Sequence, residues 1–175
     1  MARLVARALR INRSALIQSG VSSGQYAHYR LSYLMPALLW PEAVMVVAPT
    51  SIRNRLVMVD IPRLQQWMHT NKPIHVSPAT SDPMQPSEDW PHPDFTGLYI
   101  TSPEQWLSDR LHHYNRLPAH VPTIMDGVDD LENWIQEQLT VHLHSADWDA
   151  LMLACPDQRD TIRDIRVQLT RSIFQ

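Results

Sequence analysis

Short apolar runs alternate with longer stretches of mixed apolar and polar residues along much of the chain. Residues 43–48 form an apolar run without a polar interruption, which is typical of a strand covered on both faces. Elsewhere apolar residues recur at helical spacing, as in 2–11, 27–38 and 50–59. Strands that alternate with helices predict an α/β layered fold with a mainly parallel sheet of about four strands. The strand candidates are 14–18, 43–48, 97–101 and 121–125.

The middle of the chain contains a segment of different character. Residues 70–94 hold six prolines among scattered Ser, Thr and Asp residues, a composition that predicts an exposed loop. Beyond the strand candidate at 97–101, Pro103 suits the first turn of a helix that Ser102 would cap. Gln105 stands at the position that completes a capping box.

The last part of the chain has a helical pattern. From Asp130 onward we expect two or three helices, with breaks at Asp147 and Pro156. The chain therefore divides into an α/β domain over 1–135 and a helical extension over 136–175. Four tryptophans lie in apolar helical patterns and are predicted to be core residues, whereas Trp90 in the proline-rich loop is a candidate for stacking on a base or a partner. The four are Trp67, Trp106, Trp134 and Trp148.

Length and cysteine content exclude several classes of protein. A chain of 175 residues matches about one domain on the usual length scale. The single cysteine, Cys155, excludes an internal disulfide and an all-cysteine metal site, and it fits a cytoplasmic setting. No apolar run approaches the ~20 residues that a spanning helix needs, so we expect no membrane partner.

The charges are unevenly distributed. Fourteen of the fifteen basic residues are arginines, and Lys72 is the one lysine. Residues 1–66 carry a net charge of +6 and residues 126–175 a net charge of −6. The basic N-terminal third suits phosphate groups, which the acidic C-terminal third would repel. The alternative is that the two ends attract each other within the fold. The arginines at 3, 7, 10 and 13 have helical spacing, which favours a structural helix with an arginine face over a targeting segment.

The segment 14–38 has the order strand, small-residue turn, helix, which is where a phosphate-binding loop would lie. Such a loop needs glycines, so that backbone N–H groups can surround a phosphate, followed by a lysine and a Ser or Thr that binds magnesium. The glycines are present, but Gln25 stands at the lysine position and Tyr26 at the hydroxyl position. The candidate nucleotide-binding residues are Gly20, Ser22, Ser23, Gly24 and Gln25.

Three later segments follow in a recognisable order. Residues 60–64 read Asp-Ile-Pro-Arg-Leu after the second strand candidate. Residues 99–109 form a strand that turns into a helix. Residues 126–132 read Asp-Gly-Val-Asp-Asp-Leu-Glu after the last strand candidate. Together with the turn at 19–24, this set resembles the first motor domain of the DinG/XPD-like superfamily 2 DNA helicases over about residues 1–135. The resemblance implies a partial RecA-like fold of the P-loop NTPase type.

The resemblance also assigns roles to individual residues. It makes Asp126 the counterpart of the aspartate that organises magnesium. It places Arg53 and Arg55 where the second motif of the family touches the DNA backbone. It implies ATP and magnesium as ligands, but no iron–sulfur cluster, because the four cysteines of the family's insert are missing.

The departures from the family pattern argue against ATP hydrolysis. Gln25 replaces the lysine that stabilises the transferring phosphate, and Gly127 replaces the glutamate that activates water. Asp129 replaces the histidine of the same motif. The loss of one stabilising group commonly costs about 10²–10³ in rate, and such catalysis is mostly positioning and charge stabilisation. We therefore assign no catalytic residue.

Three functional hypotheses remain open at this point. The first is a catalytically degenerate helicase-like domain that binds nucleic acid, with single-stranded DNA favoured, through the N-terminal arginines. The second is a protein-interaction module in which the nucleotide cleft is vestigial and the acidic C-terminal helices dock a protein partner. The third is part of an ATP-dependent DNA helicase that another chain or missing segments would complete.

Overall fold

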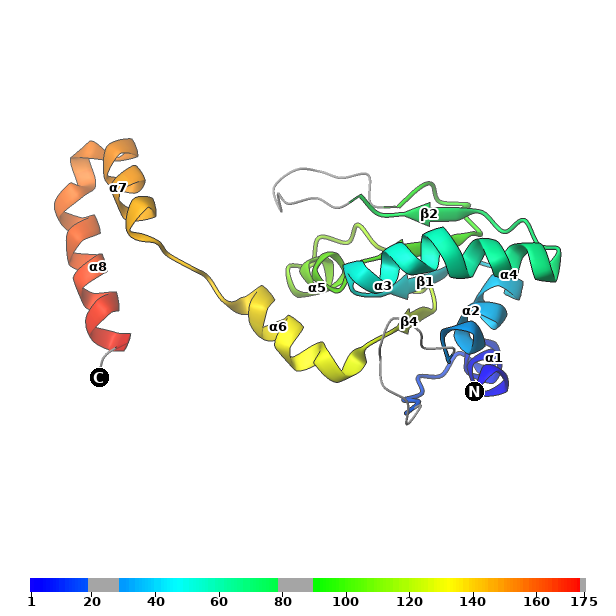
Figure 1. Cartoon of the computed structure of the whole chain (residues 1–175). Helices are drawn as coiled ribbons and strands as arrows, with labels where there is room; N and C mark the ends of the chain where they lie inside the picture. Colours follow the sequence, from blue (N-terminus) through cyan, green and yellow to red (C-terminus); the bar gives the residue numbers. More distant parts are fainter. Residues whose placement is uncertain (19–28, 79–89, 174–175) are drawn as a thin grey trace. The chain divides into compact units, whose positions relative to one another are not determined.

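The computed structural model describes residues 1–18, 29–78 and 90–173 (Figure 1). The described residues form two compact units, Met1–Gln138 and Leu139–Gln175. The first unit contains the sheet and the second consists of helices. The candidate nucleotide-binding residues between 20 and 25 lie outside the described residues.

Four parallel strands form the sheet of the first unit, in the order β2-β3-β1-β4. Val44 of β1 lies opposite Leu98 of β3, and Met45 lies opposite Thr123 of β4. The parallel α/β fold expected from the alternating pattern is thus confirmed. The strands are β1 (Val44–Val47), β2 (Ile74–Val76), β3 (Leu98–Thr101) and β4 (Thr123–Met125).

Helices connect the strands and cover the sheet. A π-helical segment, Leu56–Asp60, joins α3 to α4 without a break in the helical path. Ser102 accepts a hydrogen bond from the backbone N–H of Gln105, 3.3 Å away, which confirms the expected cap of α5. The helices of this unit are α1 (Ala2–Ile11), α2 (Tyr29–Leu39), α3 (Thr50–Arg55), α4 (Ile61–Met68), α5 (Pro103–Leu111) and α6 (Leu131–Leu139).

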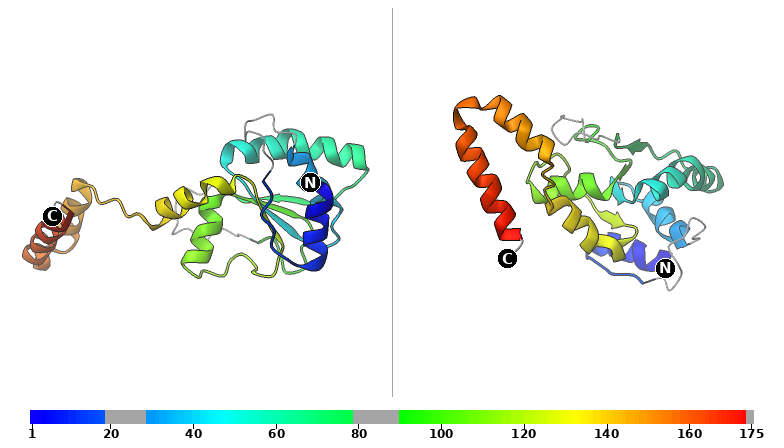
Figure 2. Two further views of the ribbon diagram at one scale, coloured as in Figure 1. Left: turned by 90° about the horizontal axis from the view of Figure 1, so that it is seen from below. Right: turned by 60° about the vertical axis from the view of Figure 1, so that its left-hand side comes forward.

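Alternate residues of the strands build a separate core on each face of the sheet. Val44 and Val46 pack with apolar residues of α1, α2 and α4 on one face. Met45 and Val47 pack with Tyr99 on the other face, where Trp106 of α5 joins them. Two views of the ribbon show α3 and α4 on one side of the sheet and α5 on the other (Figure 2). This two-sided burial explains why the strands are apolar runs rather than alternating patterns.

Two strand expectations were wrong. Residues 14–18 form no strand, and Leu16 is 84% exposed. The proline-rich stretch 70–94 is not loop throughout, because β2 lies within it between Pro73 and Pro78. As an edge strand, β2 needs only one neighbour, so prolines at its ends are tolerated.

Three further side chains are placed differently from the expectation. Lys72 is buried at the start of the proline-rich stretch, where its ammonium group donates hydrogen bonds to the carbonyls of Trp40 and Glu42 just after α2. Trp67 is 69% exposed and is no core residue. Trp90 is half-buried, with its ring centroid 5.0 Å from that of Tyr99, so it packs within the fold rather than standing free.

The second unit contains α7 (Ser145–Ala154) and α8 (Arg159–Ile173), joined by a short 3₁₀ turn, Pro156–Gln158. The break expected at Pro156 is confirmed. Asp147 marks no break, because it lies in the first turn of α7 and accepts a 2.8 Å hydrogen bond from the backbone N–H of His144. Within the described ranges of both units, no helix is both long and apolar enough to cross a membrane.

Candidate functional site

The carboxyl ends of the parallel strands bring polar side chains to one edge of the sheet. Asp126 directly follows β4, Thr101 ends β3, and Ser77 directly follows β2. All three are buried. In open α/β sheets this edge is where ligands bind, so it is the first place to look for a functional site.

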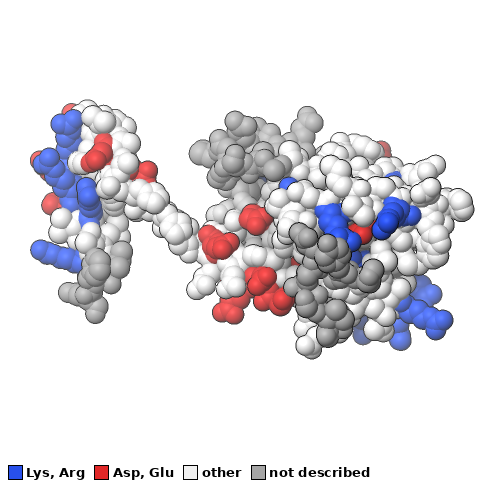
Figure 3. Space-filling view, viewed as in Figure 1, with Lys and Arg blue, Asp and Glu red and all other residues white. Residues whose placement is uncertain are grey.

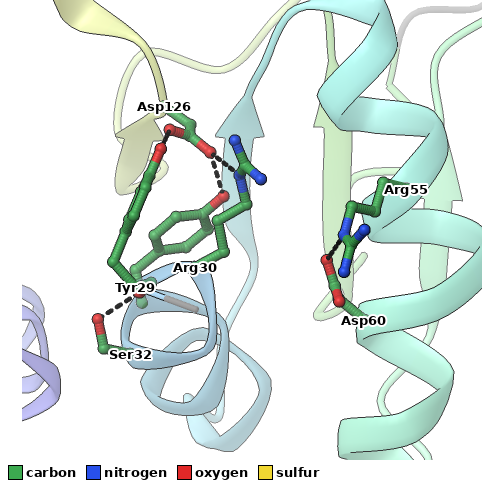
Figure 4. A network of polar contacts seen from close by, with 7 residues as sticks. Tyr29, Arg30, Ser32, Arg55, Asp60 and Asp126 are labelled. Atoms are coloured by element: carbon green, nitrogen blue, oxygen red, sulfur yellow. Dashed lines mark hydrogen bonds and ion pairs between the residues drawn. The ribbon is translucent and has the colours of Figure 1, made fainter. Parts of the chain in front are cut away.

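Asp126 lies at the centre of a network that reaches it from α2 (Figure 4). The Tyr29 hydroxyl donates to one carboxylate oxygen at 2.7 Å. The other oxygen accepts from the Arg30 Nε and from the Tyr33 hydroxyl, each at 2.8 Å. Because residues 29, 30 and 33 share one side of the first turns of α2, a single helix supplies all three donors. The network thus ties α2 to the end of β4.

Burial makes this network strong. The Arg30 side chain is 1% exposed and forms an ion pair with Asp126. Burial by itself lowers the pKa of Arg30, but the hydrogen bond to Asp126 and its charge raise that pKa above the ordinary value. Burial and the neighbouring carboxylate also raise the pKa of Tyr29 to about 12 and that of Tyr33 well above its ordinary value. At neutral pH both phenols therefore keep the protons that they donate.

The surroundings of Asp126 do not fit a magnesium site. Mg²⁺ requires free oxygen ligands in a near-octahedral arrangement, whereas both oxygens of Asp126 already accept hydrogen bonds. The guanidinium of Arg30 is a fixed positive charge beside them and would repel a cation. Among the described residues, no group of three or more His, Cys, Asp and Glu side chains is placed to hold a metal ion. The geometry instead assigns Asp126 a structural role.

Gly127 shows why no glutamate follows Asp126. Its backbone has φ 82 and ψ 31, a left-handed conformation that residues other than glycine adopt at a cost. A Cβ at this position would lie 3.5 Å from the ring of Trp134. The tight turn after β4 therefore favours glycine at this position over the glutamate of the helicase-like pattern.

Arg53 of α3 is buried at the same edge of the sheet, next to the residue that follows β2. It is 5% exposed, and its Nη1 donates to the Ser77 carbonyl at 3.4 Å. Its Nε is buried without a hydrogen-bond partner. No carboxylate in the described ranges lies within ion-pair distance of this cation. A buried arginine without a counter-charge is costly, and an anion would relieve that cost.

Hydroxyl and amide groups surround the carbonyl that Arg53 contacts. The Ser77 hydroxyl donates to the Gln105 Oε1 at 2.7 Å, and the Thr101 hydroxyl donates to the same atom at 3.0 Å. The Gln105 amide nitrogen donates in turn to the Pro78 carbonyl at 2.6 Å. This cluster fixes the ends of β2 and β3 next to Arg53.

Arg55 is not placed beside Arg53, although the resemblance groups the two. Its Nε lies 3.3 Å from a carboxylate oxygen of Asp60, across the π-helical segment (Figure 4). The two arginines therefore differ, because Arg53 is buried without a carboxylate while Arg55 is partly exposed and paired.

A row of exposed positive charge lies on α1. Arg3, Arg7 and Arg10 are exposed on this helix, while Val5 and Leu9 fix its other side in the core. No acidic residue occurs before Glu42. In the space-filling view, blue side chains gather over α1 without red neighbours (Figure 3). The helical spacing of these arginines is visible in the sequence, but their solvent exposure needs the fold.

Comparison with known proteins identifies no relative. No protein-family model matches the sequence, and neither the curated proteins nor the solved structures contain a match. The functional argument therefore depends on the chemistry of the chain itself.

Proposed function

We propose that this protein binds single-stranded nucleic acid through the arginines of its first unit, as a catalytically degenerate helicase-like domain. The observation that carries the proposal is the row of exposed arginines on α1, in a segment of the chain without acids. Arginine side chains bind phosphate oxygens with paired N–H groups. Their binding to a phosphate chain releases condensed counterions, which drives association at low salt.

Part of the apolar surface of α1 is already used within the fold and is not available to a membrane. A basic amphipathic helix that binds membranes inserts its apolar side among the lipids. Here Val5 and Leu9 on that side are already buried against α2 and the sheet. The arginine side of the helix is left for an anionic partner.

Arg53 is a second point of support. Its buried Nε has no acceptor among the described residues. Because Arg53 is 5% exposed, a phosphate oxygen would supply that acceptor only if the groups that cover Arg53 move aside. Arg53 follows β1 in the chain, at the edge of the sheet where ligands of α/β folds bind. A nucleic-acid chain that reaches both α1 and Arg53 would make phosphate contacts with exposed arginines and with a buried one.

ATP hydrolysis is not part of the proposal. The sequence has Gln25 where the resemblance requires lysine, and Asp126 is held in an ion pair with Arg30. Gln25 carries no positive charge for a transferring phosphate, and an Asp126 that is paired with Arg30 is not free to organise magnesium. Such catalysis depends on both of these charges. The protein then acts by binding alone.

Fluorescence anisotropy with a labelled single-stranded oligonucleotide tests the proposal. With four phosphates neutralised by Arg3, Arg7, Arg10 and Arg13, the logarithm of the affinity should fall with log salt at a slope near −3, since each contact contributes about 0.7. Arg7→Ala should lower the slope by about 0.7 and weaken binding at low salt. Arg163→Ala is the matched control, because it removes an exposed helical arginine from α8 that pairs with Asp160 at 3.7 Å. Equal losses in both variants would leave only nonspecific charge attraction.

A protein-interaction function is the second candidate, and the second unit favours it. Several apolar side chains are exposed there, with Leu153 at 74%. Ile162 is the one buried residue among the apolar residues described in this unit. A helical pair of this size buries too little surface to be stable alone. Sedimentation of the pure protein and co-purification of a stoichiometric protein partner test this candidate independently of nucleic acid.

A further inference from the structure

A shallow apolar groove lies beside the arginine row of α1. It has a volume of about 410 Å³ and is open to solvent. Ala6 lies on its α1 side, and Met35, Leu39 and Trp40 lie on its α2 side. The groove is lined mainly by apolar atoms, and Trp40 supplies an aromatic wall. We call this feature the α1–α2 groove.

The groove exists because small and large residues face each other across the two helices. Ala2 and Ala6 are one helical turn apart on α1 and leave space above α2. Leu39, at the end of α2, is 64% exposed and gives the groove an apolar wall that no other part of the described chain covers. An open apolar wall of this kind on a protein surface favours a ligand with an apolar face.

Two of the arginines lie at the edge of the same groove. Arg3 and Arg10 both line it and are separated by two helical turns, or about 10 Å along the axis. Both are exposed, and no ion-pair partner for either occurs in the parts of the chain that the structure describes. The groove therefore combines an apolar interior with two cations at its edge.

This combination matches the chemistry of one nucleotide in an unpaired strand. A base has flat apolar faces that stack on aromatic side chains, and each base of a strand is flanked by phosphates. In a duplex the bases are paired and stacked inside, so they cannot enter a protein groove without being extruded. The charge also selects the partner, because every charged residue before Glu42 is an arginine.

We infer that the α1–α2 groove accepts one unstacked base of a single strand while Arg3 and Arg10 contact the flanking phosphates. The inference rests on the proposed nucleic-acid function and adds to it the base contact that distinguishes a single strand from a duplex. Stacking of one base is worth roughly a five- to hundredfold change in affinity. An acidic peptide with an aromatic side chain is the competing ligand that the test must separate.

The test compares two polymers of equal charge. A labelled twelve-residue oligothymidylate and an abasic deoxyribose-phosphate chain of the same length, about twelve phosphates each, are titrated at the same salt. The wild-type protein should bind the thymidylate roughly five- to hundredfold more tightly than the abasic chain.

A variant that fills the groove tests the location. Ala6→Phe places a ring in the groove at an exposed position of α1, and it should bind thymidylate only as tightly as the abasic chain. Leu4→Phe is the control, because it adds a ring to the same helix at an exposed position outside the groove. Circular dichroism checks that both variants are folded. The control should keep the wild-type preference for thymidylate.

The outcomes separate the two proposals. Equal affinity of the wild type for thymidylate and the abasic chain would overturn the base contact and leave phosphate binding standing. Equal preference for thymidylate in Ala6→Phe and the wild type would overturn the groove as its location. Absence of binding to either polymer at low salt, with binding of an acidic aromatic peptide, would overturn nucleic acid as the ligand altogether.

Discussion

Replacement of Asp126 by asparagine should strongly destabilise the first unit, because the carboxylate faces the buried guanidinium of Arg30. Both side chains are almost completely buried, and their closest atoms are 2.8 Å apart. The substitution keeps the size of the side chain but leaves a cation without its counter-charge. Removal of one partner from a buried ion pair costs about 3–5 kcal/mol, which is a large part of the 5–15 kcal/mol that stabilises a typical domain.

Urea unfolding followed by circular dichroism measures this cost. The matched control is Asp129→Asn, an exposed acid three residues along the chain, which should change the free energy of unfolding by less than about 0.5 kcal/mol. The double variant Asp126→Leu with Arg30→Met removes both charges together. Its loss of stability should be smaller than the sum of the losses in Asp126→Leu alone and Arg30→Met alone, with a coupling energy of about 2 kcal/mol or more.

A small effect would refute the reasoning about this network. If Asp126→Asn unfolds at the same urea concentration as Asp129→Asn, the ion pair does not hold α2 to β4. If Mg²⁺ also raises the melting temperature of the wild type and not that of Asp126→Asn, the carboxylate is a metal ligand after all. We expect instead that Mg²⁺ leaves both melting temperatures unchanged, since Arg30 occupies the position beside the carboxylate.

The remaining predictions concern pH and two glycines. Burial lowers the pKa of Lys72 to about 8 from 10.5. The unfolded chain therefore binds more protons between these values, and the free energy of unfolding should rise from pH 8 to about pH 10. The pKa of Tyr29 is raised from 10.0 to about 12, so stability should fall again above pH 10. Lys72→Arg should abolish the rise, and urea titrations across this range would show whether it does. Gly97→Ala should prevent folding, because its Cβ would lie 2.3 Å from the Phe95 ring and 2.4 Å from a backbone carbonyl. Gly127→Ala meets no such clash and should cost only about 1 kcal/mol, as thermal unfolding of the two variants would show.

Much of the sheet could be predicted from the sequence, because burial on both faces leaves a simple signal. The runs at 43–48, 97–101 and 121–125 each contain a strand of the sheet. The apolar run within 14–18 has the same local character but pairs with no strand, so propensity alone could not distinguish it. Conversely, β2 was hidden by the surrounding prolines, since an edge strand needs only a short stretch of pairing.

The partners of the site residues could not be predicted in the same way. The sequence indicates an acid after the last strand, but it does not reveal that Tyr29, Arg30 and Tyr33 approach Asp126 from more than ninety residues away. Arg53 and Arg55 have the same residue type and nearly the same position, yet one is buried and the other is paired with Asp60. Such differences arise from the packing of α3 against the sheet, which no local pattern records.

The most direct test of the central claim is the salt dependence of single-strand binding by the wild type and by a variant with Arg3, Arg7 and Arg10 replaced by alanine. The wild type should bind at low salt, with a log–log slope near −3. The triple variant should have a slope no steeper than about −1. Equal slopes for the two proteins, with both folded by circular dichroism, would contradict the proposal that α1 binds the phosphate chain. Absence of binding by the wild type at low salt would reject nucleic acid as its ligand and leave a protein partner as the function to pursue.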